Sequence, residues 1–166
     1  MTNRTTAILV AVAVVAGATV AGIGLATRSS GKPARVLQID ERRGRVGSAV
    51  IGETRANVIA VLGRPAADES RGLGLETLRY PHLTIRLVAD MVGSIRTDDP
   101  AAVTLQAVRI GDPLSAARAL YRKAATCNPN SPDKQAAHPF CRVAVASGRM
   151  LVTGDPIRAI TLISTS

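Results

Sequence analysis

Residues 51–65 read IGETRANVIAVLGRP, and this stretch has the signals of a short helix with both ends marked. Thr54 is a favourable N-cap, because its hydroxyl can accept a hydrogen bond from a free backbone N–H of the first turn. Apolar residues at helical spacing form one face, namely Val58, Val61 and Leu62. Gly63 can adopt the left-handed conformation that ends a helix, and Pro65 prevents its continuation. The stretch therefore predicts a helix that begins after Thr54 and ends before Gly63.

The pattern changes from helical to alternating after this helix. Residues 75–80 and 83–87 alternate apolar and polar side chains, and the dipeptide PH at residues 81–82 favours a turn between them. Residues 92–96 can add a third strand. The run DDP at residues 98–100 then ends the pattern. These signals predict a hairpin extended by one more strand.

The same order of signals returns 59 residues later, since residues 110–114 (IGDPL) echo residues 51–55 (IGETR). Asp112 is the N-cap candidate here, and Pro113 takes the favoured first helical position. Apolar side chains then follow at helical spacing, namely Leu114, Ala117, Leu120, Tyr121 and Ala124. Three more strand candidates come next, at residues 140–146, 149–153 and 157–163. Chance convergence of two helix caps is the alternative explanation of the echo.

The order helix–strand–strand–strand, found twice, predicts an α+β fold in which the helices pack on an antiparallel sheet. Residues 48–109 are the first predicted repeat. Residues 110–166 are the second, which contains the loop between Cys127 and Cys141. Residues 28–47 are rich in charge and glycine and predict a linker, and residues 1–27 precede it as a membrane anchor or signal segment.

Residues 7–26 (AILVAVAVVAGATVAGIGLA) contain no charge. At about 1.5 Å per residue, a helix of this length spans the roughly 30 Å hydrocarbon core of a bilayer. This length favours an uncleaved transmembrane helix over a cleaved signal peptide, for which residues 24–26 (GLA) could be the exit. By the positive-inside rule, the more basic flank of a membrane helix lies in the cytoplasm. This rule opposes an external domain, because three basic residues follow the run within residues 28–35. The cysteine pair favours the outside, and we predict an extracytoplasmic domain, which would be secreted if the segment is cleaved.

Small residues recur four positions apart in this apolar run, at Ala13, Gly17 and Ala21. Such a stripe lets two transmembrane helices approach closely, so a homodimer through these residues is one interpretation. A segment this rich in alanine and glycine also contains such stripes without any function.

The net charge of +9 is concentrated near the N-terminus and in the second half of the chain. Residues 111–166 carry 7 basic residues against 3 acidic ones, and Arg118, Arg122 and Lys123 lie together on the second predicted helix. These three side chains are a candidate binding stripe for an acidic partner or lipid head groups. A solvated helix face is the alternative. Nucleic acid is a poor candidate partner, because the chain has 2 Tyr, 1 Phe and no Trp on which bases could stack.

Cys127 and Cys141 are the 2 cysteines of the chain. An even count behind an export-like N-terminus predicts a disulfide between the second helix and the next strand. A metal site at Cys127, His138 and Cys141 is the alternative. Structural zinc needs four protein ligands, however, and the fourth would have to be Asp133 or the distant His82. Free buried thiols are a third possibility; we predict the disulfide, with no metal and no other cofactor.

The sequence lacks recognisable catalytic motifs. It has no phosphate-binding loop, no dinucleotide fingerprint and no HExxH zinc motif. The two histidines, His82 and His138, lie in a predicted turn and in the cysteine-bounded loop, without a recognisable nucleophile nearby. We therefore predict a protein that is not an enzyme, with an enzyme of unknown type as the lesser alternative.

The helix and hairpin signals resemble the pattern IG-x-[ST]-x-x-x-V-x-x-x-LG-x-P, followed by a strand ending in Tyr and a hairpin, of small bacterial envelope proteins. The matching residues are Ile51, Gly52, Thr54, Val58, Leu62, Gly63, Pro65 and Tyr80. In this the chain is similar to the SmpA/OmlA outer-membrane assembly lipoproteins and to the β-lactamase-inhibitor-protein repeat, over about residues 48–163. The resemblance implies helices packed on an antiparallel sheet and non-catalytic protein binding. The chain lacks the lipidated cysteine of the lipoproteins and the exposed aromatics of the inhibitors, so β-lactamase inhibition is not implied.

Together these features predict a membrane-tethered, extracytoplasmic and non-catalytic module of the bacterial cell envelope. Its partner would be another envelope protein, and its contact with the membrane would be made by residues 7–26. A basic binder of anionic surfaces, such as lipid head groups or envelope polymers, is the alternative function.

Overall fold

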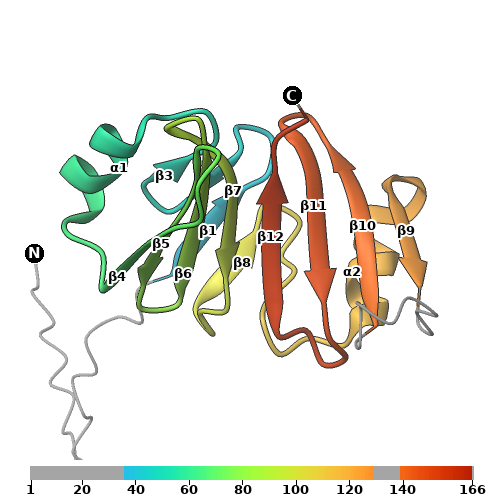
Figure 1. Cartoon of the computed structure of the whole chain (residues 1–166). Helices are drawn as coiled ribbons and strands as arrows, with labels where there is room; N and C mark the ends of the chain where they lie inside the picture. The colour runs from blue at the N-terminus through green and yellow to red at the C-terminus, as the bar shows by residue number, and fades with distance from the viewer. Residues whose placement is uncertain (1–35, 129–138, 166) are drawn as a thin grey trace, which may run out of the picture. The chain divides into compact units, whose positions relative to one another are not determined.

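The computed structural model describes residues 36–128 and 139–165, which belong to one compact unit (Figure 1). The predicted anchor at residues 7–26, with its small-residue stripe, lies outside the described residues. His138 lies outside them as well. Within the described ranges, no helix is both long and apolar enough to cross a membrane.

An antiparallel sheet of eight strands forms the centre of the fold. Along the sheet the order is β4–β5–β6–β7 and then β12–β11–β10–β9, so two four-stranded meanders meet at the pair β7 and β12. The first meander consists of β4 (Ala67–Ser70), β5 (Leu75–Tyr80), β6 (Leu83–Val88) and β7 (Met91–Thr97). The second consists of β9 (Ala125–Asn128), β10 (Phe140–Val145), β11 (Gly148–Thr153) and β12 (Ala159–Ile163).

A helix precedes each meander, and the first one, α1 (Arg55–Leu62), begins and ends as the sequence predicted. The hydroxyl of Thr54 accepts a hydrogen bond from the backbone N–H of Asn57 at 3.3 Å. At the other end Gly63 adopts a φ of +82°, and its N–H donates to the carbonyl of Ile59 at 2.9 Å. Contacts that are local in the sequence therefore mark both ends of this helix.

The second helix, α2 (Leu114–Tyr121), is capped differently from the prediction, and a single 3-10 turn, η1 (Arg122–Ala124), follows it. Pro113 rather than Asp112 is the N-cap residue, because the carboxylate of Asp112 accepts from the backbone N–H of Arg109 at 2.8 Å. The N–H of Leu114 instead donates to the carboxylate of Asp155 at 3.0 Å, across 41 residues of sequence. A negative charge there also interacts favourably with the helix dipole. The start of α2 is thus fixed by a tertiary contact.

A second sheet of four strands has the order β3–β2–β1–β8. Its strands are β1 (Leu37–Asp40), β2 (Arg45–Val46), β3 (Ala49–Val50) and β8 (Ala102–Thr104). β1 and β8 are parallel, and the other pairs are antiparallel. β1 and β2 lie inside the segment, residues 28–47, that the sequence predicted as a linker.

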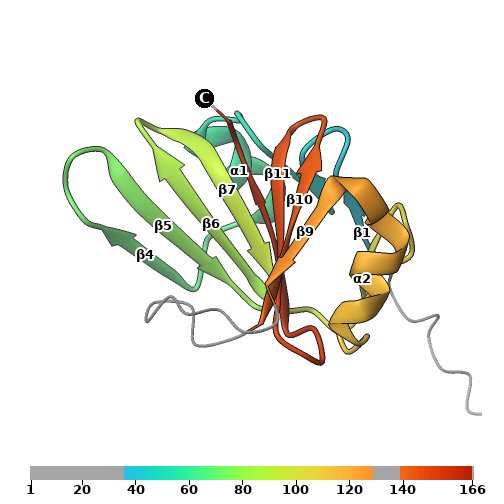
Figure 2. The same cartoon turned by 90° about the vertical axis from the view of Figure 1, so that its right-hand side faces the viewer.

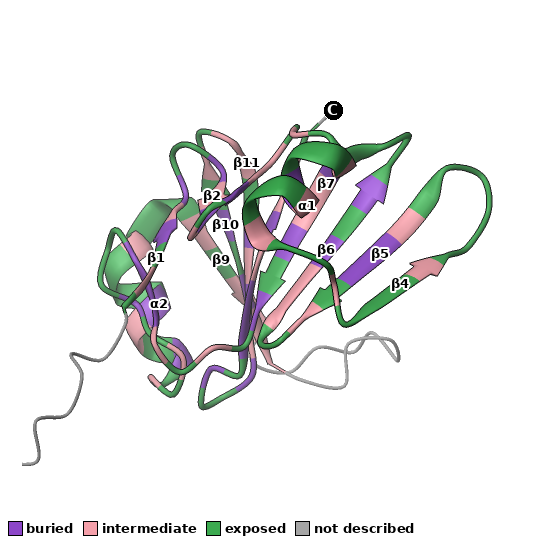
Figure 3. Cartoon of the chain, turned by 90° about the vertical axis from the view of Figure 1, so that its left-hand side faces the viewer, coloured by how far each residue is buried: buried purple, intermediate pink, exposed green. Residues whose placement is uncertain are grey.

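The small sheet and both helices lie on one face of the large sheet (Figures 2 and 3). The core between these layers is apolar and includes Ile85 and Ile160 of the large sheet, Ile39 of the small sheet and Ala117 of α2, all fully buried. No described element covers the opposite face of the large sheet, where the side chains are exposed or half-buried except for the buried Thr77 and Ala159.

The predicted fold, an α+β domain of two helix–strand–strand–strand repeats behind a transmembrane helix, is corrected to a mainly β fold. The described residues form twelve strands in two sheets and only two α-helices of eight residues each. Each helix is followed by four strands of the large sheet rather than three. The extra strands, β4 (ADES) and β9 (ATCN), are the two edges of that sheet and are too polar to show an apolar alternation.

Candidate functional site: an arginine-lined sheet face

Five exposed arginines, each on a different strand, lie on the uncovered face of the large sheet. Successive side chains of a strand point to opposite faces. Arg142 is exposed, for example, between the buried Cys141 and Val143. We call this surface the arginine face, and it consists of Arg79, Arg86, Arg96, Arg142 and Arg149.

Hydroxyl side chains flank the central arginines. Arg96 on β7 stands between Thr84 on β6 and Thr161 on β12. Arg86 on β6 has the same kind of neighbours on β5 and β7. Guanidinium groups and hydroxyls both donate hydrogen bonds, and phosphate and carboxylate oxygens accept them. The face therefore presents donors suited to anionic oxygens.

The arginines are spaced across the sheet rather than gathered at one point. Arg96 and Arg142 lie in one row, separated by the strands β12 and β11. At a strand spacing of about 4.8 Å, the three intervals between them amount to roughly 14 Å. Arg86 on β6 and Arg149 on β11 are also separated by two strands, β7 and β12, in the neighbouring row. This spacing suits an extended polyanion better than a single small anion.

Glu69 is the acidic residue that the described strands place on this face, giving it five positive charges against one negative. Its Oε1 accepts from Nε of Arg79 at 2.7 Å. This hydrogen bond lowers the pKa of Glu69 and raises the pKa of Arg79. Among the described residues, no carboxylate lies within ion-pair distance of the other four arginines, although the guanidinium of Arg142 stands 6.0 Å from the Phe140 ring centroid. Within the part of the chain that the structure describes, carboxylates therefore leave most of this positive charge unneutralised.

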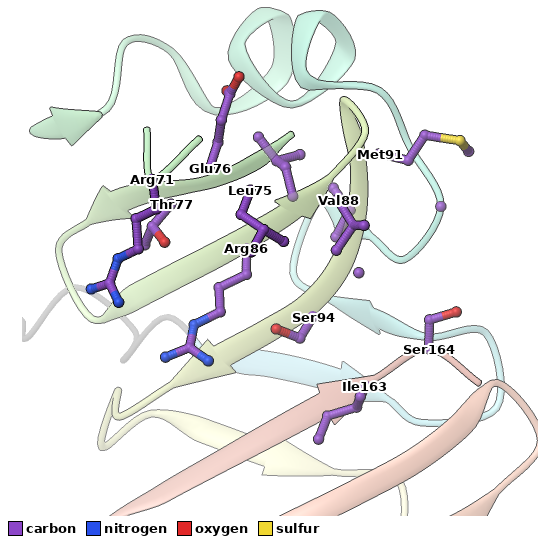
Figure 4. Close-up of a pocket in the computed structure, with 14 residues that line it drawn as sticks. Arg71, Leu75, Glu76, Thr77, Arg86, Val88, Met91, Ser94, Ile163 and Ser164 are labelled. Atoms are coloured by element: carbon purple, nitrogen blue, oxygen red, sulfur yellow. The ribbon is translucent and has the colours of Figure 1, made fainter. Parts of the chain in front are cut away.

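One end of the arginine face is hollowed into a pocket of about 750 Å³ (Figure 4). It lies over β5, β6 and β7 and reaches the end of β12. Arg71 and Arg86 extend along its polar side, and Ser94 points into the same region.

Comparison with known proteins adds a likeness of fold. No family model matches the chain, and no curated protein matches it. The chain is similar to the crystal structure, at 1.5 Å resolution, of an extracellular protein containing an SCP domain from Bacillus anthracis str. Ames. The TM-score is 0.52 and the sequence identity 14%, over 69% of this chain and 44% of the other. The chain thus spans less than half the length of that protein, and the likeness concerns the fold alone.

The predicted binding stripe, Arg118, Arg122 and Lys123, lies in a different layer from the arginine face. All three side chains are exposed at the end of α2 and in η1. α2 packs against β9, β10 and β11 on the covered face of the large sheet. The structure therefore presents two separate basic surfaces, and it does not join the predicted stripe to the larger one.

The predicted disulfide between Cys127 and Cys141 is confirmed. It links β9 to β10 at positions that face each other in the register, on the side of the sheet that α2 covers. Since both sulfurs are engaged in this bond, they do not form the alternative metal site. Among the described residues, no group of three His, Cys, Asp or Glu side chains is placed to hold a metal ion.

His82, the candidate turn residue, adopts a φ of +58° between β5 and β6. Its Nδ1 lies 3.0 Å from Oδ1 of Asp98, and both side chains are exposed. Its backbone carbonyl accepts a hydrogen bond from the hydroxyl of Thr97 at 2.9 Å. These contacts connect the turn to the end of β7. They give His82 a structural role in the hairpin.

The arginine face was missed by sequence reasoning, although its signal is present. In the segments TIRLV, SIRT and FCRVAV, an arginine stands between two residues of the apolar alternation. The alternation assigns each arginine to the face opposite the core. Which strands are neighbours, and hence that these arginines share one surface, depends on pairings that the sequence does not reveal.

Proposed function

We propose that this domain is a non-catalytic, extracytoplasmic binding module that holds an anionic polymer against the arginine face. The observation that carries the proposal is the excess of exposed arginines on a sheet face that no described element covers. Four of the five have no carboxylate partner among the described residues. Exposed charges of one sign attract a ligand of the opposite sign and raise its rate of association.

A flexible polymer fits this face better than a planar membrane does. The eight-stranded sheet is twisted, as such sheets are, so a flat surface could touch only part of it (Figure 2). A chain with regularly spaced phosphates can follow the twist and meet arginines roughly 14 Å apart. Nucleic acid remains a poor candidate, because Phe140 is the single aromatic residue beside these arginines in the described strands.

The test is the affinity of the full chain, held in neutral phosphatidylcholine nanodiscs, for polyphosphate and for poly(glycerol phosphate). Two triple variants are compared. One removes three charges from the arginine face (Arg96→Gln, Arg142→Gln and Arg149→Gln). The other removes three charges from the helix layer (Arg118→Gln, Arg122→Gln and Lys123→Gln). We expect the first to weaken binding more than about tenfold at low salt and to flatten its salt dependence.

The second variant keeps nearly wild-type affinity if the proposal is correct. Equal losses in both variants would indicate attraction by net charge alone and would overturn the assignment of the site. Binding to vesicles containing phosphatidylglycerol, with no binding to either polymer, would replace the polymer by a membrane.

The extracytoplasmic placement is supported by the disulfide, because such bonds persist in oxidising compartments and are rare in the cytosol. It is tested in intact cells with a membrane-impermeant maleimide. Cys127 and Cys141 should react only after an impermeant reductant has been added. Thiols that react only after lysis would contradict the placement and would also favour the orientation given by the basic residues after residue 26.

A second candidate function is the one that the sequence favoured, the binding of another envelope protein. The observation in its favour is Leu120, which is 46% exposed beside Arg118 and Arg122 on α2. An exposed leucine among cations suits an acidic partner with an apolar contact. A photo-crosslinking residue at position 120 should give one discrete adduct in cells, and the helix-layer variant should abolish it. The same residue at position 115, where Ser115 is also exposed on α2, is the control.

A further inference from the structure

The pocket at the end of the arginine face is lined in part by a position without a side chain, Gly93. The pairing of β6 with β7 shifts register between Arg86 and Leu87, which face Ser94 and Val92 on the other strand. Gly93 lies at this irregularity and lines the pocket. A Cβ atom there would stand 3.2 Å from Cγ2 of Val88, which is a tight contact. The pocket volume of about 750 Å³ is within the usual range for small-molecule sites.

One side of this pocket is cationic and rich in donors. The guanidinium groups of Arg71 and Arg86 extend next to each other, with the hydroxyls of Thr77 and Ser94 nearby (Figure 4). Arg86 has no carboxylate partner among the described residues, and Arg71 lies 4.0 Å from Glu69, at the limit of an ion pair. Two guanidinium groups and two hydroxyls offer more donors than one carboxylate can use, and they match the several oxygens of a phosphate.

The acidic residue of the lining, Glu76, does not oppose an anion there. Its side chain points away from Arg71 and Arg86, toward α1 (Figure 4). Its Oε2 lies 3.1 Å from Nε of Arg55, so its charge is partnered on the covered side of the sheet.

The other side of the pocket is apolar and open to solvent. Leu75 is 44% exposed, Val88 is 53% exposed and Met91 is 49% exposed. Leu75 pairs with Val88 across β5 and β6, and Val88 pairs with Met91 across β6 and β7, so the three form one continuous strip. Adjoining exposed apolar side chains on a soluble surface commonly mark a binding site.

We propose that this pocket binds a single-chain amphiphile with a phosphate head. Arg71 and Arg86 hold the phosphate, and the hydrocarbon chain covers Leu75, Val88 and Met91. The cationic and apolar halves lie side by side in one hollow. A ligand that fills both must have an apolar part, which distinguishes it from the extended polyanion proposed for the wider face. The inference does not depend on polymer binding.

The test is calorimetric titration of the full chain, in neutral phosphatidylcholine nanodiscs, with hexyl phosphate. Inorganic phosphate supplies the head alone, and hexanol supplies the chain alone. Empty nanodiscs give the background of partition into lipid. We expect hexyl phosphate to bind at least tenfold more tightly than inorganic phosphate, and hexanol not to bind measurably.

Two variants locate the ligand. Arg86→Gln removes a charge from an exposed position, and it should weaken hexyl phosphate binding about tenfold. Gly93→Val fills the floor of the pocket without a change of charge, and it should abolish binding. Gly93→Ala, a smaller intrusion, should give an intermediate loss. Arg142→Gln, on the same face but outside the pocket, is the matched control and should leave the affinity unchanged.

Equal affinity for inorganic phosphate and hexyl phosphate would overturn the amphiphile and leave only an anion site. Equal losses in Arg86→Gln and Arg142→Gln would overturn the pocket as the site. Failure here is distinguishable from failure of polymer binding, since the polymer test changes Arg96, Arg142 and Arg149 and the amphiphile test changes Arg86 and Gly93 and uses a different ligand.

Discussion

The two halves of the large sheet have the same plan, a helix followed by a four-stranded meander, but different contacts hold each helix in place. In the first half, α1 buries Val58 as its one fully buried residue and packs mainly against β3 of the small sheet. Ion pairs connect it to its meander. Arg55 pairs with Asp68 on β4, and its Nε lies 3.1 Å from Glu76 on β5.

The second half depends on packing and on a covalent bond. α2 buries Leu114 and Ala117 and packs directly on β9, β10 and β11. The disulfide joins the edge strand β9 to β10. Its four strands contain no acidic residue, and the described residues show no ion pair in them.

The two halves therefore use their charged residues differently, for stability in the first half and, as proposed, for ligand binding in the second. The first half carries the strand acids, so part of its basic charge is neutralised within the fold, and it is also the half that is hollowed. In the second half, Arg142 and Arg149 have no carboxylate partner among the described residues. Regions held by few buried apolar contacts open more readily than well-packed ones, so the pocket lies in the half expected to be less stable.

Of the changes that test this comparison, removal of the disulfide should have the largest effect on stability. The bond closes a segment with a sequence separation of 14, for which loop closure predicts a loss of about 3 kcal/mol in Cys127→Ala/Cys141→Ala. For a domain of this size the melting temperature should fall by roughly 6–12 °C. Reductant should lower the melting temperature of the wild type by a similar amount and leave the variant unchanged. An unchanged melting temperature would mean that packing alone holds the second half.

A matched pair of tyrosines gives the next largest effect. In the second half, the hydroxyl of Tyr121 donates to the buried carboxylate of Glu41 at 2.9 Å. Burial raises the pKa of Tyr121, so the hydroxyl keeps its proton at alkaline pH. A hydrogen bond to a charged group contributes about 2 kcal/mol, which Tyr121→Phe should lose in urea unfolding.

Tyr80 is the control in the first half. Its hydroxyl donates to the carbonyl of Gly63 at 3.1 Å, where it ties α1 to β5, but the bond is exposed and its acceptor is neutral. Tyr80→Phe should therefore cost less than about 1 kcal/mol. A larger loss for Tyr80 than for Tyr121 would reverse the proposed order of the two halves.

The local elements could be predicted from the sequence, and the layers could not. α1 was predicted with its caps because Thr54 and Gly63 act within one helical turn of their partners. The strands β5, β6 and β7 were predicted because the alternation in residues 75–96 is strong. α2 was predicted with the wrong cap, since its N-terminal N–H is satisfied by Asp155, which is distant in the sequence.

The mainly β character was missed for a physical reason. The edge strands β4 and β9 are polar, and β2 and β3 have two residues each, too few to show a period. The disulfide could be predicted because two cysteines allow one pairing. The arginine face could not, because it depends on β7 lying next to β12, a pairing between segments about 65 residues apart along the chain.

The smallest expected effect is the loss of stability of the first half at low pH. It also distinguishes the two halves most sharply. The hydrogen bond from Arg79 holds the pKa of Glu69 below its ordinary value of 4.5. A carboxylate with a lowered pKa in the folded state contributes stability that is fully present above about pH 4.5. This contribution is lost as the pH falls through the lower, folded pKa. The protection factors of amides in β4 and β5, which are exchange rates corrected for the intrinsic chemical rate, should therefore fall between pH 5 and pH 3. Those in β10 and β11, which contain no acid, should stay constant. Glu69→Gln should remove most of this pH dependence and, because both side chains are largely exposed, should change the melting temperature at pH 7 less than Tyr121→Phe does. The same fall in protection in β10 and β11 would show that the two halves unfold as one unit, and that the ion pairs of the first half and the disulfide of the second do not give them separate stabilities.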